Sequence, residues 1–524
     1  MQNGSFMHNE PNAPEPVSSP PRYIPTGVPG LDTILKGGFL RGGTYLVQGD
    51  AGTGKTTLGL QYLREQVKQG DRVLYVALTE TRRDIEMICK IHGWPQEEIL
   101  PFEPWAASLD PIEQAKTSIF DPADTEFGDL IKAIISEIER VRPSHLVLDG
   151  LAELRFLSGS SGRFRRQLIC LKKFLEQRSI TTLLFDDNSF KDTSDVHHAV
   201  VGGSIALEKK LPEYGRARRR IHIGKVRSSD FLEGFHDCEI RDTGLFVYPR
   251  IRVPEHAPFS GQQRILSSGV ENLDRMLKGG LLTGTASVFL GPSGVGKSSL
   301  AMQFVTNALK QGARAAVFTF DEVLTTFLAR SERLCFAGEI GALKPYLEDG
   351  RLIARQIDPA DLTPGAFAQA AIDVVDGGVS IVVIDSLNGY VNAMPEERLL
   401  TTHLHELVSY LNLRNVLTIM IVAQHGMIGD PMADFNVSYL SDNVLAMRYF
   451  ESDGEYLRGL TVLKKRTGPH ELRTRQFAIT DTGIVVGDLT SRINKSASGA
   501  LRGDIAVAEP RLSREEASEI RQNS

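Results

Sequence analysis

Two glycine-rich segments carry the residue types that hold a triphosphate. The first reads Gly49-Asp50-Ala51-Gly52-Thr53-Gly54-Lys55-Thr56, and the second reads Gly291-Pro292-Ser293-Gly294-Val295-Gly296-Lys297-Ser298. Both match G-x-x-x-x-G-K-[ST], each after an apolar run and before a helical pattern, as this phosphate-binding motif requires. The alternative is a glycine-rich turn that matches by chance, and two matches at corresponding places argue against it.

In such a turn, glycines let backbone amides surround the phosphates, and the following helix adds the positive end of its dipole. We expect Lys55 and Lys297 to reach the β and γ phosphates of ATP, and the hydroxyls of Thr56 and Ser298 to bind Mg²⁺. The other expected nucleotide contacts are Gly49, Gly52, Thr53, Gly54 and Thr57 in the first segment, and Gly291, Gly294, Val295, Gly296 and Ser299 in the second.

An acidic residue should follow a second apolar strand and hold the water shell of the metal. The segments HLVLDG and IVVIDS place Asp149 and Asp385 at such strand ends, as a Walker B aspartate requires. An aspartate that caps the following helix is the structural alternative.

Hydrolysis also needs a carboxylate that orients or deprotonates the attacking water. Glu80 and Glu322 stand at matched positions after another apolar run. The preceding residue is Thr79 in one copy and Asp321 in the other, and Asp321 is a further candidate metal ligand. The two sites are therefore chemically unequal.

The positions of these residues follow from an internal repeat. Thr26 to Glu80 aligns without a gap over Ser268 to Glu322, which is long enough for a duplicated domain with a core of its own. Short β-branched runs alternate with helical stretches in each copy. This order predicts an α/β chain with two tandem RecA-like P-loop domains, each a mainly parallel sheet with helices on both faces.

The predicted domain limits follow composition. Residues 1–20 are rich in Pro, Asn and Ser and read as a disordered tail, and residues 249–264 hold three prolines and read as a linker. The two domains then span 21–248 and 265–488, and a C-terminal tail spans 489–524.

Composition limits the function classes. The 524 residues carry a net charge of −6, which makes nucleic acid an unlikely partner. No apolar run is long enough for a membrane helix. Four scattered cysteines indicate neither a zinc site nor a disulfide framework, so a reducing cytoplasm is the expected location.

Further motifs recur outside the two glycine-rich turns. They are the opening TGVPGLDTILKGG with its second copy, the stretch TETRRDIEMICKIHGW, and the closing segments GKVRSSD with IRDTGLFV and LKKRTGPH with ITDTGIVV. On these motifs the chain resembles the KaiC family of cyanobacterial clock ATPases and autokinases, from about residue 22 to 490. The resemblance implies a homo-oligomer, a double-layered hexamer with ATP at subunit interfaces, and a KaiB-like protein as a candidate partner.

The resemblance also implies cations that reach the nucleotide of a neighbouring subunit. The matching positions hold Lys225 with Arg227 and Lys464 with Arg466. Arg219 and Arg458 occupy equivalent places, six residues before Lys225 and Lys464 respectively. Guanidinium groups suit the charge that spreads over a transferring phosphoryl group. A solvated basic strand face is the alternative.

Autophosphorylation is the next implication, and here the sequence departs from the family. The family's acceptor segment reads roughly H-I-S-T-I-T-D, whereas this chain reads Asn-Val-Ser-Tyr-Leu-Ser-Asp from residue 436. Ser438 matches the serine acceptor, Tyr439 replaces the threonine, and Ala433 replaces another hydroxyl residue. The resemblance also implies that Asp321, which stands where the family has a glutamate, is the base that activates the acceptor hydroxyl. A cycle with at most a reduced set of acceptors follows, with Tyr439 and Ser441 as candidate substitutes. A plain turn hydroxyl is the alternative for Ser438.

The resulting expectation is an ATP-driven oligomeric switch of clock type, with slow ATPase activity in both domains and serine/threonine autokinase activity in the second. Two other functions stay open. A RecA- or helicase-like DNA-dependent ATPase uses the same core, although no basic loop interleaved with aromatic residues is evident. A nucleotide-gated signalling scaffold without kinase activity would need only binding.

Overall fold

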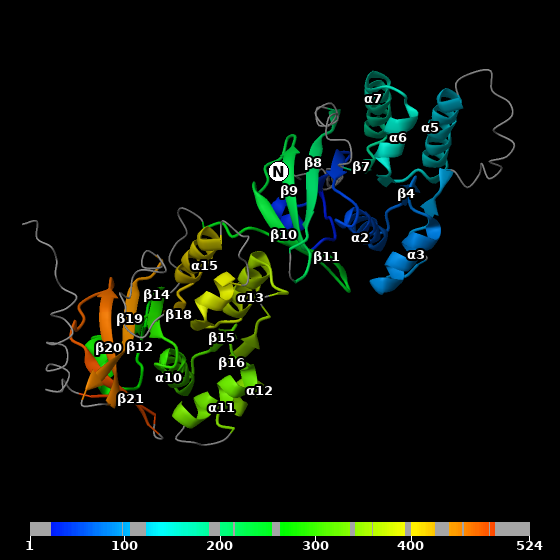
Figure 1. Ribbon diagram of the computed structural model, residues 1–524. Helices are drawn as coiled ribbons and strands as arrows, with labels where there is room; N and C mark the ends of the chain where they lie inside the picture. Colours follow the sequence, from blue (N-terminus) through cyan, green and yellow to red (C-terminus); the bar gives the residue numbers. More distant parts are fainter. Residues whose placement is uncertain are drawn as a thin grey trace, which may run out of the picture. The chain divides into compact units, whose positions relative to one another are not determined.

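A computed structural model of the chain (Figure 1) separates it into two compact units, the first ending at Arg250 and the second beginning at Ile251. The structure describes residues 22–96, 98–104, 122–187, 200–212, 215–253, 262–335, 341–358, 360–392, 400–424, 440–452, 455–480 and 483–487. The predicted tails at 1–20 and 489–524 and half of the predicted linker (residues 254–261) lie outside these residues.

Strands and helices alternate through most of the first unit before a run of antiparallel strands closes it. Its elements are β1 (Tyr23–Ile24), α1 (Leu31–Ile34), β2 (Phe39–Leu40), β3 (Thr44–Gln48), α2 (Lys55–Lys68), β4 (Val73–Ala77), α3 (Arg82–Ile91), β5 (Pro101–Phe102), α5 (Pro122–Val141), β6 (His145–Asp149), α6 (Leu151–Leu157), α7 (Ser161–Gln177), β7 (Thr181–Asp186), β8 (Gly203–Lys210), β9 (Arg218–Val226), β10 (Phe235–Arg241) and β11 (Gly244–Tyr248).

The second unit repeats this order. Its elements are β12 (Ile265–Leu266), α9 (Glu271–Met276), β13 (Leu281–Leu282), β14 (Ala286–Pro292), α10 (Lys297–Lys310), β15 (Ala315–Thr319), α11 (Leu324–Cys335), α12 (Lys344–Glu348), β16 (Leu352–Gln356), α13 (Pro364–Asp376), β17 (Ile381–Asp385), α14 (Leu387–Asn392), α15 (Leu400–Leu413), β18 (Leu417–Gln424), β19 (Asn443–Ser452), β20 (Glu455–Lys465), β21 (Arg475–Thr480) and β22 (Gly483–Val486).

Each unit is built on one large sheet. Within the described residues the sheet of the first unit has nine strands in the order β11-β10-β9-β8-β3-β7-β6-β4-β5, and the second unit has the matching order β22-β21-β20-β19-β14-β18-β17-β15-β16. In the first large sheet the strands from β8 to β5 pair in parallel and the last three strands pair antiparallel. The second large sheet has the same pattern. In each unit a separate two-stranded antiparallel sheet, β1–β2 or β12–β13, precedes the large one. The predicted fold class is confirmed.

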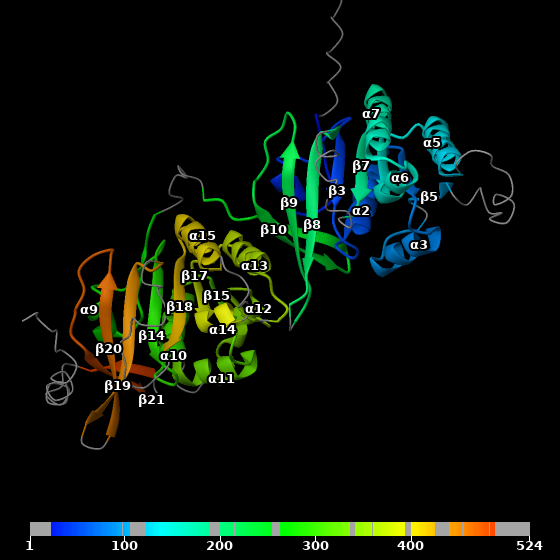
Figure 2. The same cartoon turned by 45° about the horizontal axis from the view of Figure 1, so that its top comes forward.

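Both faces of each sheet are covered, as a parallel sheet requires. Along β3, Val47 packs with α2 and α3, whereas its neighbour Leu46 packs with α5, α6 and α7 on the opposite face. Figure 2 shows these helices on the two sides of the first sheet. The strands are buried on both faces, so the sequence shows nearly continuous apolar runs.

The helix after each glycine-rich turn begins at the motif lysine, Lys55 or Lys297. Among the described residues, no helix is long and apolar enough to cross a bilayer.

Leu63 of α2 is completely buried in the core of the first unit. We expect Leu63→Ala to lower the free energy of unfolding by about 3 kcal/mol, because the lost side chain leaves a cavity. Leu211→Ala is the matched control, since Leu211 is 77% exposed and should change stability by less than about 0.5 kcal/mol. Urea unfolding of both variants measures the difference, and equal losses would contradict this packing.

Candidate nucleotide sites

Both glycine-rich turns lie where the central strand of their sheet ends, at the carboxyl edge. Gly54 and Gly296 stand directly before α2 and α10, and both adopt a φ of 111°. A Cβ on Gly296 would come within 2.9 Å of Phe477 and 2.8 Å of Ile479. Only glycine meets both requirements, so the two turns present their amides and the helix N-termini toward one point.

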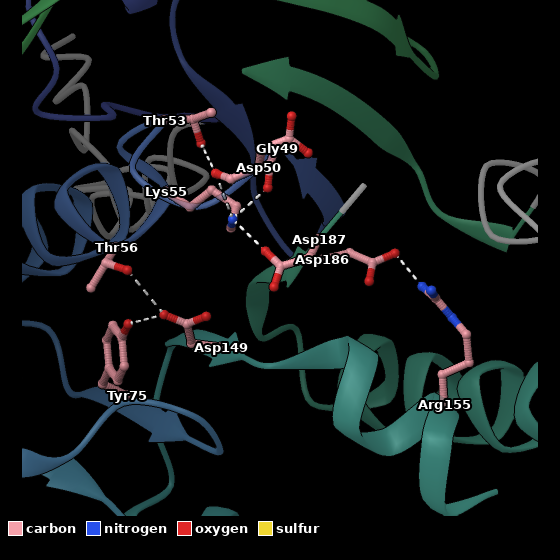
Figure 3. Close-up of polar contacts among 10 residues, drawn as sticks. All are labelled: Gly49, Asp50, Thr53, Lys55, Thr56, Tyr75, Asp149, Arg155, Asp186 and Asp187. Atoms are coloured by element: carbon pink, nitrogen blue, oxygen red, sulfur yellow. Dashed lines mark hydrogen bonds and ion pairs between the residues drawn. The ribbon is translucent and has the colours of Figure 1, made fainter. Parts of the chain in front are cut away.

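Lys55 is held by three acceptors in the first site (Figure 3). Its Nζ donates to the carbonyl of Gly49 at 2.5 Å, to the carbonyl of Asp50 at 3.3 Å, and to Oδ1 of Asp187 at 2.6 Å. The Asp187 contact was not predicted from the sequence. It places a carboxylate against the ammonium group that should bind phosphate.

Asp149 ends β6 beside the turn, as predicted. Its Oδ2 accepts the Thr56 hydroxyl at 3.3 Å and the Tyr75 hydroxyl at 2.5 Å. Burial raises the pKa of Asp149, and the Tyr75 hydrogen bond opposes that rise. Gly150, not Asp149, is the N-cap of α6, so the aspartate faces the nucleotide site and does not cap the helix.

The second site has the same plan with a different lysine environment. Lys297 Nζ donates to the carbonyls of Gly291 and Pro292 at 2.9 and 2.8 Å. Burial lowers its pKa to about 8, and the charge of Asp385 opposes the shift. Burial also raises the pKa of Asp385, and a hydrogen bond from Ser298 opposes this. The predicted pairing of hydroxyl and aspartate is therefore present in both units.

The candidate bases differ between the sites. Burial first, and then the charge of Asp149, raise the pKa of Glu80. Glu80 is held just ahead of α3 by a capping box in which Thr81 and Asp84 bond each other's backbone N–H. Glu322 instead forms an ion pair of 2.7 Å with Arg330 of α11.

Asp321 lines the same cavity as Asp385 and has a hydrogen-bond partner of its own. Its Oδ2 accepts a hydrogen bond from the buried hydroxyl of Ser386. Neither Arg330 nor Ser386 was singled out from the sequence, and both lie in the second cavity together with Asp321.

Each site opens into a cavity, of about 320 Å³ in the first unit and about 1210 Å³ in the second. Most predicted residues line them: Gly52, Thr53, Gly54, Lys55, Thr56, Thr57, Glu80 and Asp149 in the first, and Gly294, Gly296, Lys297, Ser298, Ser299, Asp321, Glu322 and Asp385 in the second. Gly49 and Gly291 take part through their carbonyl oxygens. Val295 is different, because its side chain is completely buried in the core.

The predicted cation pairs do not lie near the turn of their own unit. Lys225 pairs with Ser204 at the amino end of the sheet, whereas Arg219 lies six residues away along β9, about 20 Å at strand spacing. In the second unit Lys464 donates to the carbonyl of Ser441 at 2.7 Å, and Arg466 approaches Asp442 at 3.6 Å. Both pairs therefore face away from the turn of their own unit.

Arg219 and Arg458 lie at the other end of the same strands. Arg219 donates to the carbonyl of Gly52 at 3.3 Å through Nε and Nη2. Arg458 pairs with Tyr449, and its guanidinium carbon lies 5.9 Å from the centre of the Tyr449 ring. These two arginines therefore lie at the carboxyl edge, unlike the four cations at the amino edge (Lys225, Arg227, Lys464 and Arg466).

Burial, together with neighbouring cations, lowers the pKa values of Lys225 and Lys464. Burial first, and then Arg227 and Lys172, lower the pKa of Lys225. Burial and Arg466 likewise lower the pKa of Lys464, while Asp442 opposes the shift. An anion such as phosphate would relieve this repulsion between like charges.

The acceptor segment is only partly described. Ser438, Tyr439 and Ala433 lie outside the described residues. Ser441 is described and is completely buried, which makes its hydroxyl a poor acceptor.

The donor sets fit Mg²⁺ bound together with a nucleotide. A hydroxyl and a carboxylate meet in each site (Thr56 with Asp149, Ser298 with Asp385), and these are hard oxygen ligands. Among the described residues, no cluster of three His, Cys, Asp or Glu could hold a metal alone. The phosphates would therefore complete the coordination.

Comparison with known proteins identifies the family. The model of the ATPase family KaiC matches residues 24–252, 266–341 and 366–491. The chain belongs to the KaiC family of ATPases. It is 25% identical to the circadian clock oscillator protein KaiC of Prochlorococcus marinus over 91% of this chain and 95% of that protein. It is also 25% identical to the circadian clock protein KaiC3 of Synechocystis sp. (88% and 91% covered) and to the KaiC of Synechococcus elongatus (91% of each).

Membership in the KaiC family makes this chain an ATP-binding P-loop ATPase. The sequence missed residues that distinguish its two sites, chiefly Tyr75, Asp187 and Arg330. Asp186 and Asp187 did carry a signal, since they end an apolar strand as Asp149 does. Tyr75 gave none, because its counterpart in the second unit is Val317.

Removing the Tyr75 hydroxyl should make Asp149 harder to ionise. We expect Tyr75→Phe to raise the pKa of Asp149, so that Mg²⁺-dependent nucleotide binding at the first site is lost at a higher pH on acidification. Binding titrations between pH 5 and 8 in a Lys297→Ala background measure the shift. An unchanged acid limb would show that the Tyr75 hydrogen bond does not tune the metal ligand.

Proposed function

We propose that this chain is an ATP-driven oligomeric switch of clock type, with slow ATPase activity in both units and serine autokinase activity in the second. The observation that carries the proposal is the split arrangement of each site. The turn, the aspartate and the candidate base share the carboxyl edge of a sheet. The cation pairs Lys225 with Arg227 and Lys464 with Arg466 lie at the amino edge.

Within one site, each group has one task. The lysine and the amides bind the β and γ phosphates, and the hydroxyl of Thr56 or Ser298 and the carboxylate of Asp149 or Asp385 hold Mg²⁺. The metal, when bound, neutralises charge that develops on the phosphates. Glu80 or Glu322 orients the attacking water and accepts its proton.

Turnover is expected to be slow in the first unit. Thr79 stands where the second unit has Asp321, so a single carboxylate acts there. In the second unit, slow turnover has a different reason. Arg330 donates to Glu322 at 2.7 Å, and Glu322 must exchange this partner before it can hold a water molecule. Slow hydrolysis suits a switch or a timer better than a motor.

A neighbouring subunit supplies the missing charges in this proposal. Lys225 with Arg227, and Lys464 with Arg466, are too far from the turn of their own unit to reach its γ-phosphate. In a ring, the amino edge of one subunit would face the carboxyl edge of the next, which supports ATP sites between subunits. The proposed number of six subunits rests on the resemblance to the KaiC family. Guanidinium and ammonium groups there would stabilise the transferring phosphoryl group.

Autokinase activity follows the same geometry. Ser441 and Asp442, at the described end of the acceptor segment, lie beside Lys464 and Arg466 at the amino edge. A phosphoryl group from ATP in the second site of one subunit would therefore be transferred to Ser438 of its neighbour, with Asp321 or Glu322 accepting the hydroxyl proton. Ser438, which matches the serine acceptor of the family, is the proposed acceptor, and the burial of Ser441 argues against that residue.

The clock-type role and the partner rest on relatives. The proteins compared above are named as circadian clock proteins, and on that basis we propose a regulatory role in the cytoplasm with a KaiB-like partner. The state of the ATP sites would set the affinity for that partner.

Nucleotide retention and hydrolysis should separate in two double variants. Lys55→Ala with Lys297→Ala should lose ATP retention in the presence of magnesium, because the triphosphate loses its main cation in both sites. Glu80→Gln with Glu322→Gln should retain ATP and lower kcat about a hundredfold. Filter binding and phosphate release measure the two effects, and full hydrolysis by the glutamine variant would exclude these bases.

Mixed subunits test transfer between neighbours. One variant carries Lys297→Ala and the other Ser438→Ala, and neither should label itself with γ-labelled ATP. When the two are assembled together, label should enter only the Lys297→Ala subunits, because they keep the acceptor and their neighbours keep the donor. Phosphopeptide mapping reads the result, and an absence of label from Ser438 in the unsubstituted protein would end the kinase proposal while leaving the ATPase intact.

A further inference from the structure

The ammonium group of Lys55 has no hydrogen bond left for a phosphate. An ammonium group carries three donors, and here they are directed at the carbonyls of Gly49 and Asp50 and at Oδ1 of Asp187. The Asp187 contact, at 2.6 Å, is the only one of the three in which the acceptor is charged. A phosphate that bonds Lys55 must therefore displace one of these acceptors, and Asp187 is the one whose negative charge competes with that of the phosphate.

Asp187 is held in this position from behind. The preceding residue, Asp186, is 2% exposed and forms an ion pair with Arg155 of α6. Successive side chains of a strand point to opposite sides, and Figure 3 shows Asp186 directed to Arg155 and Asp187 directed to Lys55. The buried ion pair thus fixes the end of β7, and with it the carboxylate at the turn.

The second site lacks this carboxylate. Gln48 lies opposite Asp186 in the first sheet, so Asp187 is level with Gly49; in the second sheet Gly291 lies opposite Ala423. Ala423 lines the second cavity as Asp187 lines the first. Among the described residues, the only hydrogen-bond acceptors of Lys297 are the two carbonyls of its own turn.

The charge around the two cavities differs in the same sense. Among the described residues, the first cavity is lined by one cation, Lys55, and four carboxylates, those of Glu80, Asp149, Glu153 and Asp187. The second is lined by three cations (Lys297, Arg330, Arg333) and three carboxylates (Asp321, Glu322, Asp385). Arg219, which donates to the carbonyl of Gly52, does not offset the four carboxylates, so a free triphosphate meets net negative charge in the first site only.

We propose that Asp187 makes the first site selective for metal-bound ATP over metal-free ATP, by competing with the phosphates for Lys55. Mg²⁺ reduces the charge of the triphosphate and is itself attracted by the surrounding carboxylates, so the complex enters where the free nucleotide is opposed. The second site, with Ala423 at this position, discriminates less. This inference rests on the proposed binding of ATP at the first site.

The test measures equilibrium binding of a fluorescent ATP analogue to the full-length protein in a Lys297→Ala background, with excess Mg²⁺ or with EDTA. Asp187→Asn should tighten metal-free binding about tenfold, the worth of one charged hydrogen bond. Binding with Mg²⁺ should change by less than about threefold. Glu153→Gln removes the same charge from the same cavity without touching Lys55, and it should leave the ratio of the two affinities within about twofold.

The reciprocal variant keeps the result independent of the fold of the first unit. In a Lys55→Ala background, Ala423→Asp should weaken metal-free binding at the second site about tenfold, with a smaller effect in Mg²⁺. Equal effects of Asp187→Asn with and without Mg²⁺, or the same effect from Glu153→Gln, would overturn the inference. If the Lys297→Ala protein binds no nucleotide even with Mg²⁺, the proposed first site itself fails, which is a different outcome.

Discussion

Parallel strands all end at one edge of a sheet, and this constraint decides where the chemistry of the chain can occur. β3, β4, β6 and β7 run in the same direction, so the residues that follow them meet although they are far apart in sequence. The turn after β3, Glu80 after β4, Asp149 at the end of β6 and Asp187 after β7 surround one cavity. The second unit repeats this arrangement with its own residues.

The antiparallel strands add the opposite constraint. β9 and β20 run back along the sheet, so residues late in these strands return to the amino edge. Arg219 therefore reaches the turn of its own unit, and Lys225 on the same strand cannot. A strand of fixed rise per residue separates two groups of cations by about 20 Å. The cations proposed to act on the nucleotide are thus divided between two edges of each sheet, which is the physical reason for the proposal that subunits complete each other's sites.

The sequence predicted the fold and the carboxyl-edge residues because both depend on local patterns. The glycine-rich turns, the apolar runs and the aspartates at strand ends can be identified without knowing which strands are neighbours. Tyr75 and Arg330 could not be found in this way. Tyr75 reaches Asp149 only because β4 and β6 pair. Arg330 reaches Glu322 only because α11 begins at Leu324, just after that residue, and turns Arg330 back toward it. Asp187 had the same signal as Asp149, but its contact with Lys55 depends on β7 lying next to β3.

The two units meet the same electrostatic difficulty in different ways. The ammonium group of a lysine at the N-terminus of a helix, partly removed from water, is disfavoured in its charged form unless an anion lies near it. In the first unit the carboxylate of Asp187 is that anion, and it forms an ion pair with Lys55 before any nucleotide binds. In the second unit no carboxylate among the described residues bonds Lys297, and burial lowers its pKa to about 8. Phosphate is then the group that best restores its charge. The two units therefore share the phosphate-binding turn and differ in the residue beside its lysine, Asp187 in the first and Ala423 in the second. The two sites need not fill or empty together.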